Sequence, residues 1–214
     1  MNENISRSFT FQFEDSKWIL KILLGGILMF IPILNFLSIG FAMRILRNTS
    51  QGSEPFLPEF DNWEELFKEG LFGFIITMIY SIGFFIIFSV LGILTGIPLL
   101  GCLFGLVNLA LMFVLGFFSI VWFNLSLIKY METNDLKSAF DVVAIYNEFK
   151  SKAKDYLIAA VVYSLAISIL TLFCCFPAFY GVLASAAGIG AIYYSGKSAE
   201  TVSDESSEEE PEFE

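Results

Sequence analysis

Residues 71–128 read LFGFIITMIYSIGFFIIFSVLGILTGIPLLGCLFGLVNLALMFVLGFFSIVWFNLSLI, and they contain no Asp, Glu, Lys or Arg. A helix needs about 20 apolar residues to cross a hydrocarbon core about 30 Å thick, so this stretch is long enough for two spans. The segment TGIP, residues 95–98, interrupts it near the middle and predicts a tight turn. We therefore expect a helical hairpin over 70–128.

Two other apolar stretches follow the same plan. Residues 156–196 also lack charged side chains, and CCFP with Pro177 divides them. Residues 18–47 carry Pro32 at their centre, where a proline breaks or kinks a helix. This first stretch is either one tilted, kinked span or two half-length helices that meet at Pro32 and return to the starting side.

The fold class follows from these three proline-centred stretches, whose centres read FIPIL, GIPLL and CFPAF. The chain is 56% hydrophobic and 16% charged, whereas a soluble domain is about 25% charged. We expect an all-α integral membrane protein, a helical bundle of about three helical hairpins. Four spans are clear, and the N-terminal helix pair is kinked or re-entrant.

The placement of basic residues predicts the orientation. With three hairpins, all 12 Lys and Arg fall on one side, which the positive-inside rule makes the cytoplasm, together with the C-terminal tail. If the first stretch spans once, Arg7, Lys17 and Lys21 move outside and nine basic residues remain inside. The rule prefers the hairpins, and five spans stay open.

Polar segments flank the membrane domain, which we place at residues 18–197. Residues 1–17 predict an N-terminal interfacial arm, in which Phe9, Phe11 and Phe13 alternate with polar residues as in an extended segment or an irregular aromatic anchor. Residues 198–214 are rich in Ser, and the last twelve carry seven acids and no base. Such a like-charged block predicts a disordered tail, which explains most of the net charge of −10.

Two amphipathic segments adjoin the spans. In PFLPEFDNWEELFKEG, residues 55–70, Asp61 is positioned to cap a helix whose third residue is Glu64. Residues 134–153 predict a second amphipathic helix with an apolar stripe. We expect both at the cytoplasmic membrane interface. The expected interfacial anchors are Trp18, Lys21, Phe60, Trp63, Phe67, Phe140 and Phe149.

Small residues recur at the spacing that lets membrane helices approach closely. They predict helix-packing positions in GCLFG and in YGVLASAAGIGAIYYSG. The expected positions are Gly101, Gly105, Gly181, Ser185 and Gly188.

The sequence offers little for catalysis. It has no histidine, and no Ser–His, Cys–His or paired-carboxylate site can be assembled from it, so we expect no enzyme activity. Its cysteines lack metal-ligand spacing, and we expect no metal or cofactor. A disulfide from Cys102 to Cys174 or Cys175 is a hypothesis beside buried free thiols. Without a basic patch, nucleic acid is not an expected partner.

Several segments resemble the family called domain of unknown function 4013, small membrane proteins of prokaryotes. The segments are FEDSKWILKILLGG, IPILNFLSIGF and LPEFDNWEELFKEGL, within residues 9–196. Phe41 stands where the family commonly has a Tyr-like residue, and the acidic tail lies outside the pattern. The resemblance implies location and architecture, not an activity. Its best-matching positions are Asp15, Trp18, Lys21, Gly25, Gly40, 57–60, Trp63 and Gly70.

The predicted function is a non-catalytic, multi-pass module of the cytoplasmic membrane of a prokaryote. Its expected partners are membrane lipids and either a protein partner or further copies of itself. The alternative is a passive carrier or channel for a neutral or amphiphilic solute, which a cavity lined by Asn108 and Asn124 would favour.

Overall fold

The computed structural model describes residues 3–97, 100–173 and 175–208, and over these residues it is helical with no strand. The all-α fold class is confirmed. The elements in chain order are α1 (Glu3–Thr10), η1 (Phe11–Glu14), α2 (Trp18–Phe30), α3 (Asn35–Ser50), α4 (Trp63–Leu94), α5 (Gly101–Thr133), η2 (Ser138–Phe140), α6 (Val142–Ser151), α7 (Ala153–Phe173) and α8 (Cys175–Glu208).

Four of the described helices are long and apolar enough to cross a membrane, in α4, α5, α7 and α8. The structure thus has the four predicted spans, and the chain is a membrane protein. Helix α2 is apolar but has only 13 residues, fewer than the roughly 20 that a span requires. A turn that contains Pro32 separates α2 from α3, so the first apolar stretch forms two helices.

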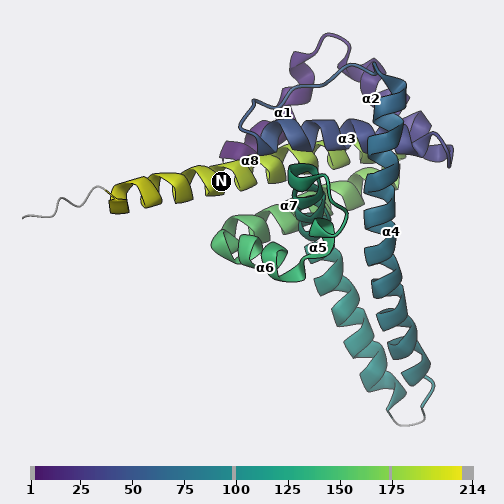
Figure 1. Ribbon diagram of the computed structural model, residues 1–214. Helices are drawn as coiled ribbons and strands as arrows, with labels where there is room; N and C mark the ends of the chain where they lie inside the picture. The colour runs from purple at the N-terminus through teal and green to yellow at the C-terminus, as the bar shows by residue number, and fades with distance from the viewer. Residues whose placement is uncertain (1–2, 98–99, 174, 209–214) are drawn as a thin grey trace, which may run out of the picture.

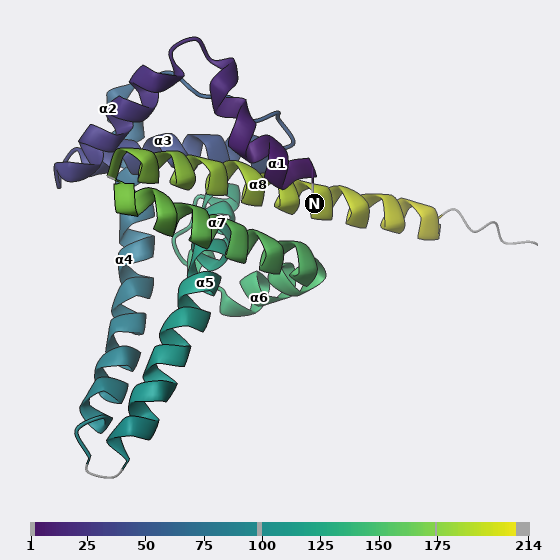
Figure 2. The same cartoon turned by 180° about the vertical axis from the view of Figure 1, so that it is seen from behind.

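Helix α8 is the centre of the molecule. It packs against α1, α2, α3, α5 and α7 (Figures 1 and 2). Of the residues in its apolar window, 72% are buried within the protein. Small side chains make this possible, because bulky ones would hold the surrounding helices apart.

The α4–α5 hairpin extends away from this body (Figures 1 and 2). Only 6% of the residues in the apolar window of either helix are buried. The buried positions of α4 lie in its first half, from Leu66 to Ile76, and those of α5 lie in its second half, from Val121 to Ile128. The open end of the hairpin therefore packs on the body, and the rest projects.

The N-terminal arm is helical, so the interpretation of residues 9–13 as an extended segment is wrong. Ile5, Ser8 and Gln12 are buried at helical spacing, and Phe13 is exposed. The hydroxyls of Ser8 and Tyr163 share a hydrogen bond of 2.7 Å, and the amide of Gln12 donates to the carbonyl of Tyr180. The contacts with α7 and α8 thus determine the conformation of the N-terminal arm, and the alternation of aromatic and polar residues along it does not.

The predicted cap of α4 is also wrong. Helix α4 begins at Trp63, after Asn62 in the left-handed conformation (φ 48°), and has no side-chain cap. Asp61 instead accepts a hydrogen bond of 2.6 Å from Arg44 on α3. The long-range ion pair takes the carboxylate that would otherwise cap the helix.

The amphipathic segment 134–153 is divided rather than continuous. Asp141 separates η2 from α6 and caps α6, because its carboxylate accepts a hydrogen bond of 3.0 Å from the backbone N–H of Ala144. Helix α8 continues to Glu208, beyond residue 198 where the sequence predicts disorder. Extending an existing helix fixes one residue per added hydrogen bond, without a new nucleation step. Residues 209–214 lie outside the described residues.

Helices α3 and α4 meet at glycines. A Cβ at Gly40 would lie 2.1 Å from the carbonyl oxygen of Leu66, and one at Gly70 would lie 1.7 Å from that of Phe36. These contacts are with backbone atoms, which cannot rotate away as a side chain can. Any larger residue must push the two helices apart.

We predict that Gly40→Ala lowers the free energy of unfolding by about 1–3 kcal/mol, the usual cost of overpacking. The matched control is Gly83→Ala in α4, where a Cβ would have nothing within 4 Å. The control should be neutral or slightly stabilising, since Ala favours helix more than Gly does. Thermal unfolding in detergent measures both, and equal midpoints for the two variants would contradict this packing.

Candidate functional site

A buried lysine joins the start of α2 to the segment between α3 and α4. The Nζ atom of Lys21 lies 2.6 Å from Oδ2 of Asp15 and 2.9 Å from Oε1 of Glu59. It also donates to the carbonyl oxygen of Leu57 at 3.2 Å. The side chain of Lys21 is only 6% exposed. All three donors of the ammonium group are therefore used in what we call the Lys21 cluster: Asp15, Lys21, Leu57 and Glu59.

The local sequence prepares Asp15 for this contact. Its second carboxylate oxygen accepts a hydrogen bond of 2.7 Å from the backbone N–H of Lys17, and its carbonyl accepts one from Trp18 at the start of α2. Lys21 follows one turn into α2. The carboxylate and the ammonium group are thus held on the same side of the helix end.

The two charges change each other's protonation. The hydrogen bond from Lys21 lowers the pKa of Asp15 below its ordinary value, although burial acts in the opposite direction. Burial alone would lower the pKa of Lys21, but its hydrogen bonds to Asp15 and Glu59 outweigh burial and raise it. Both groups stay charged at neutral pH.

A second cation pins the same connecting segment. Arg44 of α3 binds Asp61 at 2.6 Å and Glu65 at 3.7 Å, and it donates to the carbonyl oxygen of Glu59. Close by, the rings of Phe41 and Phe60 stack with centroids 4.2 Å apart. The segment between α3 and α4 has no regular structure of its own, so these contacts fix its path.

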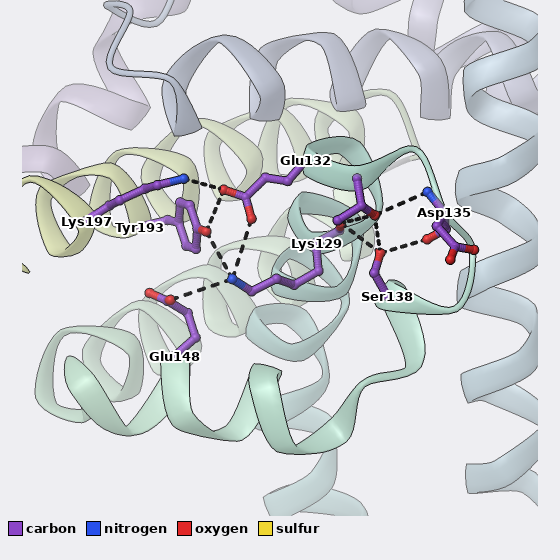
Figure 3. Close-up of polar contacts among 8 residues, drawn as sticks. Lys129, Glu132, Asp135, Ser138, Glu148, Tyr193 and Lys197 are labelled. Atoms are coloured by element: carbon purple, nitrogen blue, oxygen red, sulfur yellow. Dashed lines mark hydrogen bonds and ion pairs between the residues drawn. The ribbon is translucent and has the colours of Figure 1, made fainter.

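The second polar cluster joins the end of α5 to α6 and α8 (Figure 3). We call it the Lys129 cluster: Lys129, Glu132, Glu148, Tyr193 and Lys197. Lys129 donates to the hydroxyl of Tyr193 at 3.1 Å, and that hydroxyl donates to Glu132 at 2.8 Å. Lys197 binds the same oxygen of Glu132 at 2.8 Å, and Lys129 lies 3.9 Å from Glu148.

The turn after α5 is closed by its own polar side chains, as Figure 3 shows. The hydroxyls of Thr133 and Ser138 lie 2.6 Å apart, and Ser138 also donates to the carbonyl of Lys129. The carboxylate of Asp135 accepts a hydrogen bond from the backbone N–H of Lys137. These bonds hold the chain that leads from α5 into η2 and α6.

A cavity of about 640 Å³ adjoins the Lys129 cluster. It lies between α3, α5 and α8, and its lining combines cationic, anionic, neutral polar and apolar side chains. The lining includes Arg47, Gln51, Met131, Glu132, Tyr194 and Lys197. Arg47 is itself paired with Glu69 of α4. The cavity therefore places charges of both signs beside apolar side chains.

The predicted interfacial anchors lie in different surroundings. Lys21 is buried in its ion cluster, and Trp63 is about half exposed. All six aromatic anchors lie against other rings: Trp18 against Phe13, Phe60 against Phe41 and Trp63, Phe67 against Phe36, Phe140 against Tyr80, and Phe149 against Phe118 and Tyr156. Their role at a membrane interface stays a prediction.

The predicted helix-packing positions divide into two groups. Gly181 lies against Ile167 of α7, and a Cβ at Gly188 would lie 1.6 Å from the hydroxyl of Tyr163. Ser185 is buried and donates to the carbonyl of Val182 in its own helix.

The other two positions belong to the hairpin. A Cβ at Gly101 would meet the carbonyl of Thr95 in the adjacent turn, and one at Gly105 would have nothing within 4 Å. Gly101 thus lies against the residue that caps the end of α4, and Gly105 faces open space. Cys102 is exposed. Cys174 and the side chain of Cys175, its hypothetical disulfide partners, lie outside the described residues.

The family model described as "Protein of unknown function (DUF4013)" matches residues 24–179, well over half of the chain. The chain belongs to this family. The match confirms the resemblance and carries no activity with it. No curated protein matches the chain, and neither does any solved structure. Asp15 and Lys21 precede the matched range, and Lys21 joins Asp15 to Glu59, which lies inside that range.

The pairing within both clusters was not predicted from the sequence. Lys21 and Glu59 are 38 positions apart, and Lys129 and Tyr193 are 64 apart. The available signal was a lysine one turn inside an apolar helix, which must find counter-charges if it is buried. That signal identifies Lys21 and leaves its partners open.

We predict that Lys21→Met lowers the free energy of unfolding by about 1–3 kcal/mol. Removing one partner of a buried pair costs about 3–5 kcal/mol, and the exposure of Glu59 and partly of Asp15 reduces this cost. Lys68→Met is the matched control, because Lys68 forms an exposed pair with Glu64.

The Asp15→Asn/Lys21→Met double variant should lose less than the sum of its single variants, since each removes the same contact. Thermal or denaturant unfolding in detergent measures the native protein, the two single variants, the double variant and the Lys68→Met control. A loss for Lys21→Met no greater than that for Lys68→Met would contradict a stabilising role of the cluster.

The Asp15–Lys21 pair also predicts a pH dependence. Since the pKa of Asp15 is lowered by folding, its contribution is present above about pH 4 and is lost as the pH falls through the folded-state pKa. The stability difference between the native sequence and Asp15→Asn should therefore shrink below about pH 4. Unfolding midpoints between pH 7 and 3 measure this. A constant difference over that range would contradict it.

Proposed function

We propose that the protein is a non-catalytic module of the cytoplasmic membrane of a prokaryote, which contacts lipids and a partner protein or further copies of itself. The exposed α4–α5 hairpin is the observation that carries this proposal. Phe85 on α4 is 72% exposed and Phe113 on α5 is 61% exposed. Surfaces of this kind are stable only against lipid or another apolar surface.

The charge distribution supports the proposed orientation. The connection between α4 and α5 contains no charged residue, and the Lys129 cluster lies at the opposite, open end of the hairpin. By the positive-inside rule, that open end faces the cytoplasm. The C-terminal tail follows α8 from the same cluster and is proposed to be cytoplasmic.

The proposal assigns no reaction to the two polar clusters. Their lysines bond to carboxylates and to a tyrosine hydroxyl, an arrangement that holds helix ends together. Several serine and threonine hydroxyls in the helices donate to carbonyls one turn earlier, as Thr77 and Ser126 do. This is the common structural role of hydroxyls in membrane helices.

The carrier alternative receives less support. Asn124 does line a cavity of about 200 Å³ between α3, α4, α5 and α8, but the amide of Asn124 is bonded to the carbonyl of Ile120. Asn108 is not among the residues that line this cavity. The cavity is small and its lining is mostly apolar. These properties are as consistent with imperfect helix packing as with a solute site.

Photo-crosslinking tests the proposed contact surface. A benzophenone amino acid placed at Phe85 or Phe113 in native membranes should react with lipid and with a defined protein, either a partner or a second copy. The matched control is Phe118, on α5 but packed against Phe149, which should react within the chain. Crosslinks from Phe85 and Phe113 that are only intramolecular would contradict the proposal.

Native mass spectrometry of gently extracted protein then distinguishes the alternatives. A stoichiometric complex or a defined homo-oligomer agrees with the module. A monomer that retains a neutral solute, other than membrane phospholipid, favours the carrier.

A further inference from the structure

The cavity beside the Lys129 cluster has features that the proposed function does not use. It is formed where three helices end together: Ser50 and Gln51 at the end of α3, Met131 and Glu132 near the end of α5, and residues near the end of the apolar part of α8. Its volume of about 640 Å³ is within the usual range for small-ligand sites, about 300–1,000 Å³. It can therefore hold a group much larger than a few waters.

The position of the cavity along the chain is that of a membrane–water boundary. The charge-free stretch that includes α5 ends at Ile128, which lines the cavity, and Lys129 follows directly. The charge-free part of α8 ends just before Lys197, another lining residue. The cavity is thus apolar on the side of the spans and charged at their ends, as a lipid headgroup requires.

Its charges are of both signs. Arg47 and Lys197 can bind a phosphate, and Glu132 can bind a cation. Each cation already has a carboxylate near it, Glu69 for Arg47 and Glu132 for Lys197. A ligand that is only anionic would compete with Glu69 and Glu132 for these cations, whereas a ligand with both charges offers Glu132 a new cation when its phosphate binds Lys197.

The end of α3 adds to the attraction for a cation. The C-terminal end of a helix carries negative partial charge on its last carbonyl groups, and Ser50 and Gln51 place that end at the cavity. A primary ammonium group can donate hydrogen bonds to a carboxylate and to carbonyls, which a quaternary ammonium group cannot. A single aromatic ring, that of Tyr194, lines the cavity, so no aromatic cage for a quaternary amine is formed there.

We propose that this cavity binds a phosphoethanolamine group, with Arg47 and Lys197 at the phosphate, Glu132 at the amine, and Ile128 and Met131 against the apolar part of a phospholipid. This inference rests on the proposed function and deepens it, because it names the lipid class that the module recognises. Basic pockets between membrane helices on the cytoplasmic side are known to bind lipid headgroups.

The test uses the full-length protein in nanodiscs that contain equal amounts of phosphatidylethanolamine, phosphatidylglycerol and phosphatidylcholine. After release into detergent, native mass spectrometry measures which lipid is retained. The native sequence should retain phosphatidylethanolamine about tenfold over the other two lipids, the effect of one charge-assisted hydrogen bond. Equal retention of the three lipids, or a preference for phosphatidylglycerol, would overturn the assignment to a phosphatidylethanolamine lipid.

Variants separate the site from general lipid contact. Lys197→Gln should lose about tenfold in retention, and its side chain is 63% exposed, so the fold should tolerate the change. Glu132→Gln should remove the preference over phosphatidylglycerol while leaving phosphate binding. Lys68→Gln, on α4 outside the lining, is the matched control and should retain lipid like the native sequence. Losses that are equal in Lys197→Gln and Lys68→Gln would overturn the assignment.

A second experiment, with a soluble ligand, identifies the source of the phosphoethanolamine group. Glycerophosphoethanolamine is added to delipidated protein, and the unfolding midpoint is compared with that in glycerophosphoglycerol. A selective upward shift without lipid retention assigns the site to a free metabolite of the same chemistry, and retention assigns it to the lipid. If neither selective lipid retention nor a selective shift of the unfolding midpoint is observed, the proposed site is overturned. The photo-crosslinks from Phe85 and Phe113 do not depend on this cavity. They therefore test the proposed module function even if the cavity binds no phosphoethanolamine group.

Discussion

The close approach of α8 to its neighbours is the contact on which the rest of the structure depends. A Cβ at Gly188 would lie 1.6 Å from the hydroxyl of Tyr163 on α7, and one at Gly190 would lie 2.0 Å from the hydroxyl of Thr49 on α3. Lipid chains are as apolar as the side chains they would replace, so burial in a membrane gains little from the hydrophobic effect. Close packing of neighbouring side chains against the backbone of α8, which only small residues allow, supplies the attraction instead.

In this protein the usual relation between hydropathy and burial is accordingly reversed: the most apolar helices are the least buried. The apolar windows of α4 and α5 have mean hydropathies of 2.5 and 2.3, yet almost none of their residues are buried. The window of α8 reaches only 1.2, and most of it is buried. The most apolar helices face outward because lipid is their solvent, and the less apolar α8 is buried with many small residues among the large apolar side chains of the core.

The structural features that depend on neighbouring residues could be predicted from the sequence. The charge-free stretches identified the four spans, and Pro32 marked the break between α2 and α3, because length and backbone chemistry decide both. Prediction failed where a distant group competed for the same side chain. The carboxylate of Asp61 binds Arg44 of α3 and does not cap α4. The partners of Lys21 and Lys129 could not be predicted, because nothing local to a lysine specifies which of many carboxylates reaches it.

The two polar clusters show why the hairpin can project without support along its length. Glu59 lies four residues before α4 and Lys129 lies near the end of α5, so both clusters hold the open end of the hairpin. An ion pair at the end of a membrane span, where water or headgroups replace hydrocarbon, costs the least to desolvate. Farther out, α4 and α5 need only each other and lipid. The fixed base and the projecting apolar arm are therefore consequences of one rule: polar contacts are placed where the spans end, and the spans between them are left free to contact the membrane or another apolar surface.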